Sequence, residues 1–78
     1  MTTLRQIRAE AAERHGLTVD EIMSRNAPTE RRINAARQEA WRLSERAGYT
    51  VSQIGRLWGR DHSTVAHGIR QAKKRASK

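Results

Sequence analysis

Apolar residues recur every three or four positions along most of the chain, which is the spacing that places them on one face of an α-helix. Glycines and short polar runs separate these stretches, and both are typical of helix ends. Five stretches show the pattern, the second of them short, at about residues 4–15, 19–24, 30–47, 51–58 and 62–75. They predict one small all-α domain over residues 1–78, which we expect to be a four-helix domain.

Capping chemistry supports these helix ends. Three helices begin with a threonine followed three positions later by Gln or Glu, the capping-box spacing in which two side chains accept hydrogen bonds from each other's backbone N–H groups. The pairs are Thr3–Gln6, Thr18–Glu21 and Thr50–Gln53. Thr29 and Asp61 are candidate N-caps of the third and fifth helices, with Thr64 three positions after Asp61. The glycines expected to end helices are Gly16, Gly48 and Gly59.

Each helix is expected to bury one apolar face in a common core. The third helix carries small residues on that face, which let another helix approach closely. Trp41 and Trp58 are expected in the core and not as base-stacking platforms, because each belongs to or borders an apolar face. The predicted core faces are Leu4, Ile7, Ala11, Val19, Ile22, Met23, Ile33, Ala36, Ala40, Leu43, Ala47, Val51, Ile54, Leu57, Trp58, Val65, Ile69 and Ala72.

Composition and charge narrow the function classes. The chain has no Cys, which removes disulfides, thiol catalysis and cysteine-rich zinc sites. No apolar run reaches the roughly 18 residues that span a membrane, and the charged start does not resemble a secretory signal. The formal net charge of +8 is uneven, because residues 1–24 hold three basic and four acidic side chains, whereas residues 25–78 hold thirteen and four. A basic half on a small domain is typical of a polyanion binder.

The last two predicted helices form the pattern of a helix-turn-helix: a short helix, a glycine turn, and a second helix with a polar start and a basic end. The second helix of this motif enters the major groove by its N-terminal end, so its first residues need side chains that read base edges. Asp61 can accept from the cytosine amino group, and it can also serve as the helix cap. The expected base contacts are Asp61, His62, Ser63 and Thr64.

Residues 54–67, Ile-Gly-Arg-Leu-Trp-Gly-Arg-Asp-His-Ser-Thr-Val-Ala-His, resemble the signature of the C-terminal DNA-binding domain of the bacterial replication initiator DnaA. The family pattern runs roughly Ile-Gly, a spacer, an aromatic residue, Gly-Arg-Asp-His-Thr-Thr-Val, and His one residue further on. Trp58 takes the aromatic place and Ser63 that of the first Thr, while Ala36-Arg37-Gln38 resembles the family's Pro-Arg-Gln. The resemblance covers about residues 4–72 and implies a Trp-repressor-like helical fold.

The resemblance also implies a DNA target, a short asymmetric duplex site of the TTATnCACA type, and an arginine inserted in the minor groove from the basic loop before the third helix. The sequence departs from the family here, because Thr29 stands at that place and Glu30 adds a repelling charge; Arg25 and Arg31 are the candidates to substitute. Contacts to the DNA backbone or minor groove are expected from Arg25, Arg31, Arg32, Arg37, Ser52, Gln53, Arg60, His67, Arg70 and Lys74.

Several polar residues have a plainer interpretation beside this one. His67 is either a phosphate contact or an exposed polar residue, and the basic tail 73–78 is either solvated or in contact with DNA. His62 and His67 lie about 140° apart on a helix and have no third ligand nearby, so no metal site is expected. Ser63 points away from the adjacent His62, so we expect no catalytic residue. No GxxxxGK[ST] phosphate loop is present, and no cofactor is expected.

The sequence therefore predicts a non-enzymatic, sequence-specific double-stranded-DNA-binding module. We expect it to bind DNA as a monomer in the cytoplasm, associated with the nucleoid, in bacterial or phage transcription or replication control. One alternative is the DNA-targeting fragment of a replication initiator whose ATPase part is absent. Another is a basic protein-interaction module, in which the acidic-leaning first helix docks a protein partner. A third is membrane-surface binding through the basic tail, although no membrane partner is expected.

Overall fold

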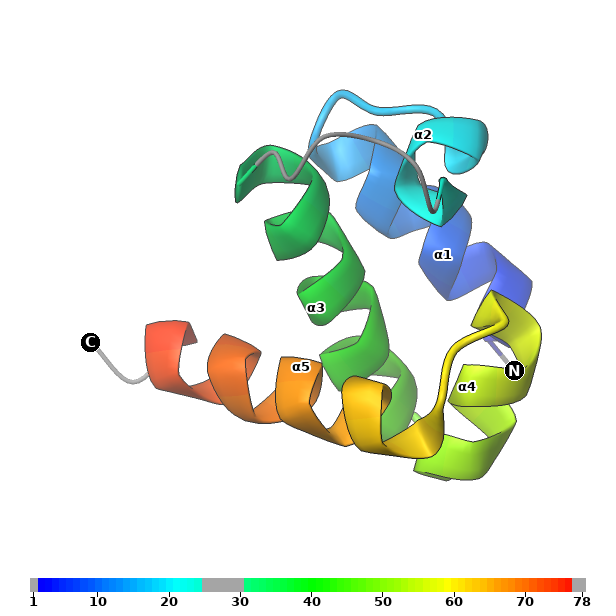
Figure 1. Ribbon diagram of the computed structural model, residues 1–78. Helices are drawn as coiled ribbons and strands as arrows, with labels where there is room; N and C mark the ends of the chain where they lie inside the picture. The colour runs from blue at the N-terminus through cyan, green and yellow to red at the C-terminus, as the bar shows by residue number, and fades with distance from the viewer. Residues whose placement is uncertain (1, 25–30, 77–78) are drawn as a thin grey trace.

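The computed structural model describes residues 2–24 and 31–76, which contain helices and no strand. This arrangement confirms the predicted all-α class, shown in Figure 1. All five predicted stretches form helices, so a count of five replaces the four-helix description for the described residues. The helices are α1 (Leu4–Arg14), α2 (Val19–Met23), α3 (Arg31–Arg46), α4 (Val51–Trp58) and α5 (His62–Ala76).

Local hydrogen bonds fix where these helices begin. In the first capping box, Gln6 N–H donates to Thr3 Oγ1 at 3.2 Å and Thr3 N–H donates to Gln6 Oε1 at 2.8 Å. The other two predicted boxes are present with the same pair of hydrogen bonds. The three boxes satisfy backbone N–H groups that a helix start leaves without partners. The predicted cap Thr29 lies outside the described residues.

The helices end as their glycines predict. After α1, Gly16 adopts a left-handed φ of 69°, and Leu17 N–H donates to Ala12 O at 2.8 Å across it. This is a Schellman motif, which satisfies carbonyls at a helix end and turns the chain sharply. The same pattern follows α3, where Tyr49 N–H donates to Ser44 O at 3.1 Å. The sequence therefore encodes the helix ends locally.

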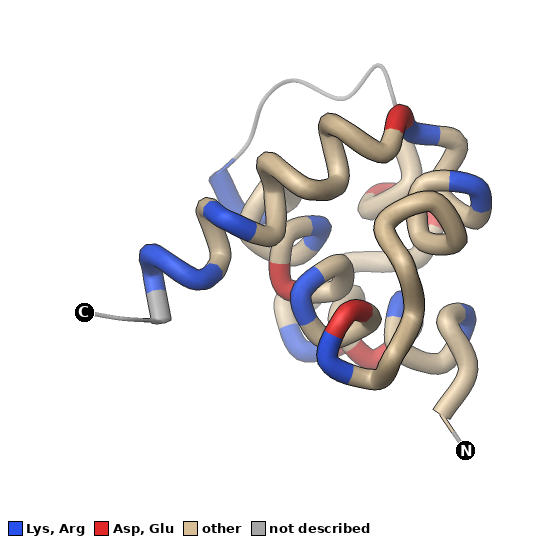
Figure 2. The backbone as a smooth tube through the Cα atoms, turned by 90° about the horizontal axis from the view of Figure 1, so that it is seen from below, with Lys and Arg blue, Asp and Glu red and all other residues tan. Residues whose placement is uncertain are grey.

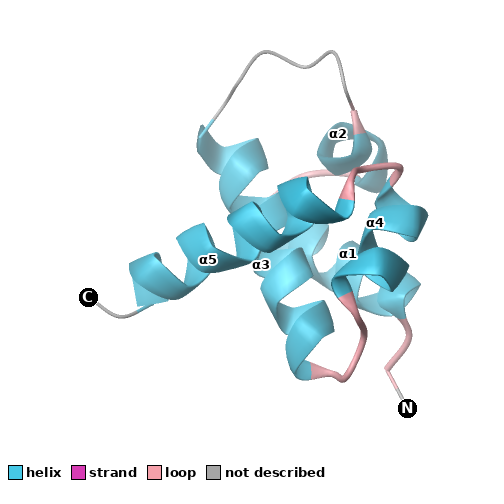
Figure 3. Ribbon diagram, turned by 60° about the horizontal axis from the view of Figure 1, so that its bottom comes forward, coloured by secondary structure: helices cyan, strands magenta, loops and turns pink. Residues whose placement is uncertain are grey.

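Helix α3 runs through the middle of the molecule and packs against the other four helices (Figure 1). Helix α1 lies beside it, and α5 crosses one end of it and continues outward to the C-terminus. The described connections between helices are short loops, seen in Figure 3. The relative positions of the helices are therefore set mainly by side-chain packing against α3.

Most of the predicted core faces are buried, including all three apolar residues predicted for α5. Ala47 is exposed, which makes that prediction wrong, because α3 ends at Arg46 and Ala47 follows its last turn. Ser44 is buried instead, and its hydroxyl donates to Ala40 O at 2.7 Å. Several predicted core residues are only partly buried and pack against the core, namely Leu4, Val19, Met23, Val51 and Leu57. Leu43 is also only partly buried.

Two tryptophans join α3, α4 and α5. Trp41 is 5% exposed and Trp58 is 2% exposed, and their rings meet edge to face with centroids 5.7 Å apart. Both are therefore core residues, as predicted. Gly68 of α5 lies on the Trp41 ring so closely that a Cβ there would be 2.4 Å from Trp41 Cε3. The missing side chain of Gly68 is thus what allows α5 to approach α3 this closely.

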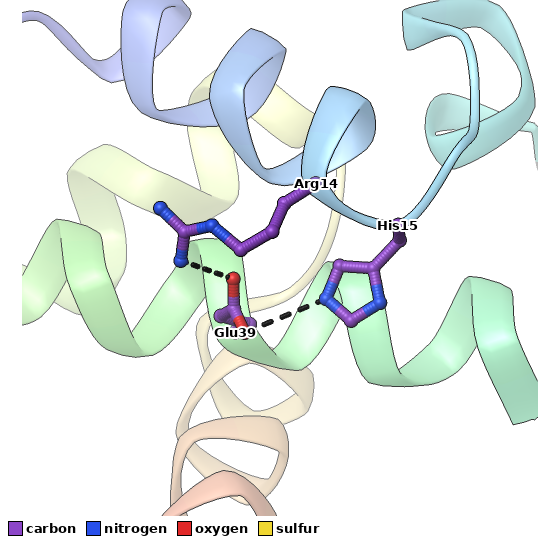
Figure 4. Close-up of polar contacts among 3 residues, drawn as sticks. All are labelled: Arg14, His15 and Glu39. Atoms are coloured by element: carbon purple, nitrogen blue, oxygen red, sulfur yellow. Dashed lines mark hydrogen bonds and ion pairs between the residues drawn. The ribbon is translucent and has the colours of Figure 1, made fainter.

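Ion pairs also connect neighbouring helices at the surface of this core. Arg14 Nη1 of α1 lies 2.7 Å from Glu39 Oε1 of α3 (Figure 4). His15 Nε2 lies 3.4 Å from Glu39 Oε2, which becomes an ion pair when the imidazole is protonated. Lys73 Nζ of α5 lies 3.2 Å from Glu45 Oε1 of α3. These partly exposed pairs contribute little individually, about 0–1 kcal/mol each, so apolar packing dominates.

The Trp58→Ala substitution is expected to lower the free energy of unfolding by about 3–5 kcal/mol, because it removes a buried aromatic ring and leaves a cavity. Chemical denaturation followed by circular dichroism measures this loss. Arg56→Ala is the matched control, since Arg56 is exposed on the same helix. Equal stability of the two variants would contradict the central position of Trp58.

Candidate nucleic-acid interface

The turn between α4 and α5 is built on two glycines. Gly59 ends α4 in the left-handed region at φ 64°, and Arg60 N–H then donates to Gly55 O at 2.9 Å. A Cβ on Gly55 would lie 2.6 Å from Arg60 O, a backbone atom that cannot move without changing the turn. The two glycines thus set the angle at which α5 leaves α4, which is the geometry of a helix-turn-helix.

The start of α5 presents four consecutive exposed polar residues, those predicted as base contacts: Asp61, His62, Ser63 and Thr64. Asp61 occupies the N-cap position, because its carbonyl accepts from Val65 N–H at 3.2 Å. Its carboxylate Oδ1 lies 3.5 Å from Ser63 N and 3.1 Å from His62 Nδ1. Asp61 therefore caps weakly through Ser63 and contacts the imidazole, a contact that the sequence pattern did not reveal.

Beyond its first turn, α5 is divided into a buried and an exposed face. Ser63, His67, Arg70 and Lys74 follow one another at helical spacing, and all four are exposed. The buried face packs against the core through Val65, Gly68, Ile69 and Ala72. Figure 2 shows the basic positions of α5 gathered toward its C-terminal end. The helix therefore presents polar groups first and positive charge afterwards.

A cleft of about 220 Å³ continues this face from α5 onto α3. Two predicted contact residues of α5, Thr64 and His67, meet Asn34 and Gln38 of α3 there. Asn34 and Gln38 were not among the predicted contacts, because the sequence does not show which side of α3 faces α5. The buried Trp41 Nε1 and Gln38 Oε1 have no hydrogen-bond partner among the described residues. Arg37, Arg60 and Gly68 complete the lining.

Arg37, predicted to contact DNA, is used within the protein. Its guanidinium donates to the carbonyls of Ile22, at 2.7 Å, and Ser24, which tie the end of α2 to α3. Arg60 Nη2, from the turn before α5, lies 3.4 Å from the same Ser24 oxygen. Burial, and secondarily the positive charge of Arg60, lower the pKa of Arg37 below its ordinary value. The structure thus places Arg37 as a tie between helices, beside the interface.

The other predicted contacts lie at helix starts. Arg31 and Arg32 are exposed in the first turn of α3, and Ser52 and Gln53 are exposed in the first turn of α4. Gln53 Oε1 accepts from Thr50 N–H at 2.8 Å, which leaves its NH₂ group to donate elsewhere. Arg25 lies outside the described residues.

Residues 2–24 and 31–76 hold neither a metal-binding cluster nor a membrane-spanning helix. No group of three or more His, Asp or Glu side chains there could hold a metal ion. No helix in that part of the chain combines the length and apolarity needed to cross a membrane.

Comparison with known proteins gives one finding. The model of the family described as "Bacterial dnaA protein helix-turn-helix" matches residues 4–72, which include the turn between α4 and α5 and the exposed run Asp61–Thr64. No match was found among curated proteins or among solved structures.

Arg37→Ala is expected to lower the free energy of unfolding by about 1–3 kcal/mol, because the carbonyls of Ile22 and Ser24 lose a partly buried hydrogen-bond donor. Thermal and urea denaturation measure the change. Arg32→Ala is the control, since Arg32 is exposed in the first turn of the same helix and should be nearly neutral for stability. Full stability of Arg37→Ala, with weaker DNA binding, would instead make Arg37 a direct contact.

Proposed function

The chain belongs to the bacterial DnaA helix-turn-helix family, a family of DNA-binding modules, and on this basis we propose that it recognises a specific double-stranded sequence through α5. The observation that carries the proposal is the exposed run Asp61–Thr64 at the start of α5. In a helix-turn-helix, the N-terminal end of the second helix reaches the base edges in the major groove. These four side chains are the ones that such docking brings to the bases.

The positions of the charged residues along α5 also support docking by its N-terminal end. Arg70 and Lys74 lie on the exposed face that begins with Ser63, so they can meet phosphates beside the groove while the first turn meets bases. At the start of α4, Ser52 and Gln53 are exposed where backbone N–H groups and the helix dipole favour a phosphate. Phosphate contacts fix the register of the protein on the duplex, whereas the base contacts supply specificity.

We assign the chain a non-catalytic role in transcription or replication control, as a single DNA-binding domain over residues 1–78. One chain presents the whole exposed run Asp61–Thr64, which supports binding as a monomer. Residues 1–78 contain no phosphate loop for ATP, so this module would contribute DNA targeting and no ATP hydrolysis of its own. A bacterial cytoplasm with its nucleoid is the setting that this role implies.

Binding is expected to be strongly salt-dependent. If about five phosphates are neutralised, the plot of log K against log[salt] for duplex DNA has a slope near −4 to −5, because bound cations are released from the DNA. Fluorescence anisotropy titrations between low and physiological salt measure this slope. A slope shallower than about −2 would show that the basic residues of α5 and α3 do not lie on DNA.

Substitutions of Ser63 and Lys74, both on the exposed face of α5, are expected to affect DNA binding in different ways. Ser63→Ala should lower affinity for a site selected from random duplexes while leaving binding to random DNA unchanged, because Ser63 faces bases. Lys74→Ala should weaken binding to both duplexes by the same factor and reduce the salt slope by at most about one. If Ser63→Ala weakened both duplexes equally, the first turn of α5 would not be reading sequence.

A further inference from the structure

The side chains of Asp61 and His62 contact each other at the start of α5. Asp61 Oδ1 lies 3.1 Å from His62 Nδ1 and 3.5 Å from Ser63 N. An ionised carboxylate only accepts hydrogen bonds, and a neutral imidazole carries its proton on one nitrogen only. The contact therefore favours the tautomer in which Nδ1 carries the proton and donates it to Asp61. Hydrogen bonds of this kind commonly set which histidine nitrogen is protonated.

This arrangement leaves an acceptor on each of the two side chains. With its proton on Nδ1, His62 has a lone pair on Nε2. Asp61 uses Oδ1 for both of its contacts, so Oδ2 remains available as an acceptor. The side chains are 68% exposed for Asp61 and 66% exposed for His62, so both acceptors can be reached from outside. The first turn of α5 thus presents two neighbouring acceptors and no donor from these residues.

Resting on the proposed function, we propose that Asp61 is a positioning residue for His62 as well as a reader, and that the pair selects two bases carrying amino groups. In the major groove, amino groups occur on cytosine N4 and adenine N6. Guanine presents only acceptors there, and thymine presents an acceptor and a methyl group. Each base pair thus carries one amino group in the groove, on one strand only. An acceptor placed against the base of the other strand is left without a partner, so the pair distinguishes which strand carries the amino group.

The tautomer can be measured without DNA, by ¹⁵N NMR of the imidazole rings at pH 8. We expect the spectrum of His62 to show the proton on Nδ1. His67 is an internal control, because it is exposed on the same helix and makes no ion pair with a carboxylate among the described residues. In Asp61→Ser, which keeps a good N-cap residue, His62 should change toward the spectrum of His67. A wild-type His62 that already matched His67 would overturn the proposal.

The base preference is measured on a duplex site selected from random sequences at the same pH. His62→Ala identifies the position that His62 faces, as the one where discrimination between base pairs is lost. Every base pair has adenine or cytosine on one strand, so the deciding measurement is the effect of removing that base's amino group. Where that base is adenine, replacement by purine, which lacks the N6 amino group, should weaken wild-type binding about tenfold and leave His62→Ala nearly unaffected.

The outcomes separate this proposal from the proposed function. Wild-type binding that is unchanged when the amino group at the His62 position is removed overturns the proposal and leaves sequence-specific binding intact. Failure to select any sequence overturns the proposed function, and the base preference with it, whatever tautomer the NMR spectrum shows. Asp61→Ser should also lower the discrimination at the His62 position. Circular dichroism of that variant shows whether α5 is still folded, so a loss of structure is not mistaken for a loss of positioning.

Discussion

The contact between Gly68 of α5 and the ring of Trp41 of α3 determines how the rest of the molecule is arranged. A Cβ at position 68 would come within 2.4 Å of the ring, so only glycine lets the two helices approach this closely. The approach buries Trp41 against Trp58 and so brings α4 into the same core. Because one side of α5 is committed to this contact, the opposite side, with Ser63 and His67, must face outward. The interface is therefore a consequence of core packing.

Local rules explain why the helices could be predicted from the sequence. Each capping box is complete within four residues, and each Schellman motif within six, so neighbours in the sequence supply all the partners. The apolar stripe of α5 was also correct in full, because a terminal helix that packs by one face needs only one stripe. The prediction was less accurate for α3, which has neighbours on several sides. Which residues of α3 are buried depends on which helices pack against each of its sides, and Ser44 rather than Ala47 is buried.

Some features of the candidate site could likewise be predicted from the sequence, whereas others depend on tertiary packing. The exposed start of α5 could be predicted, because a polar run that opens an amphipathic helix has nowhere to be buried. The role of Arg37 could not, since its partners Ile22 and Ser24 are backbone carbonyls whose position follows from the packing of α2 on α3. Asn34 and Gln38 were missed for the same reason, as the cleft exists only where α3 and α5 meet. The sequence thus does not show which arginines also bind within the protein, and the DNA contact predicted for Arg37 stays a prediction.

Asp61 is the only acidic residue in residues 46–78, which otherwise carry eight basic side chains. A carboxylate at the start of a helix that approaches DNA is repelled by phosphates, so it lowers affinity for every duplex alike. A helix cap alone does not require this charge, because serine or threonine would cap as well without repulsion. The charge is useful if the carboxylate fixes the proton on Nδ1 of His62 and accepts a hydrogen bond from a base amino group. Both effects increase the difference in binding free energy between the target sequence and other sequences. In the proposed function, nonspecific attraction comes from basic residues such as Arg70 and Lys74, and Asp61 adds to discrimination although its charge opposes that attraction.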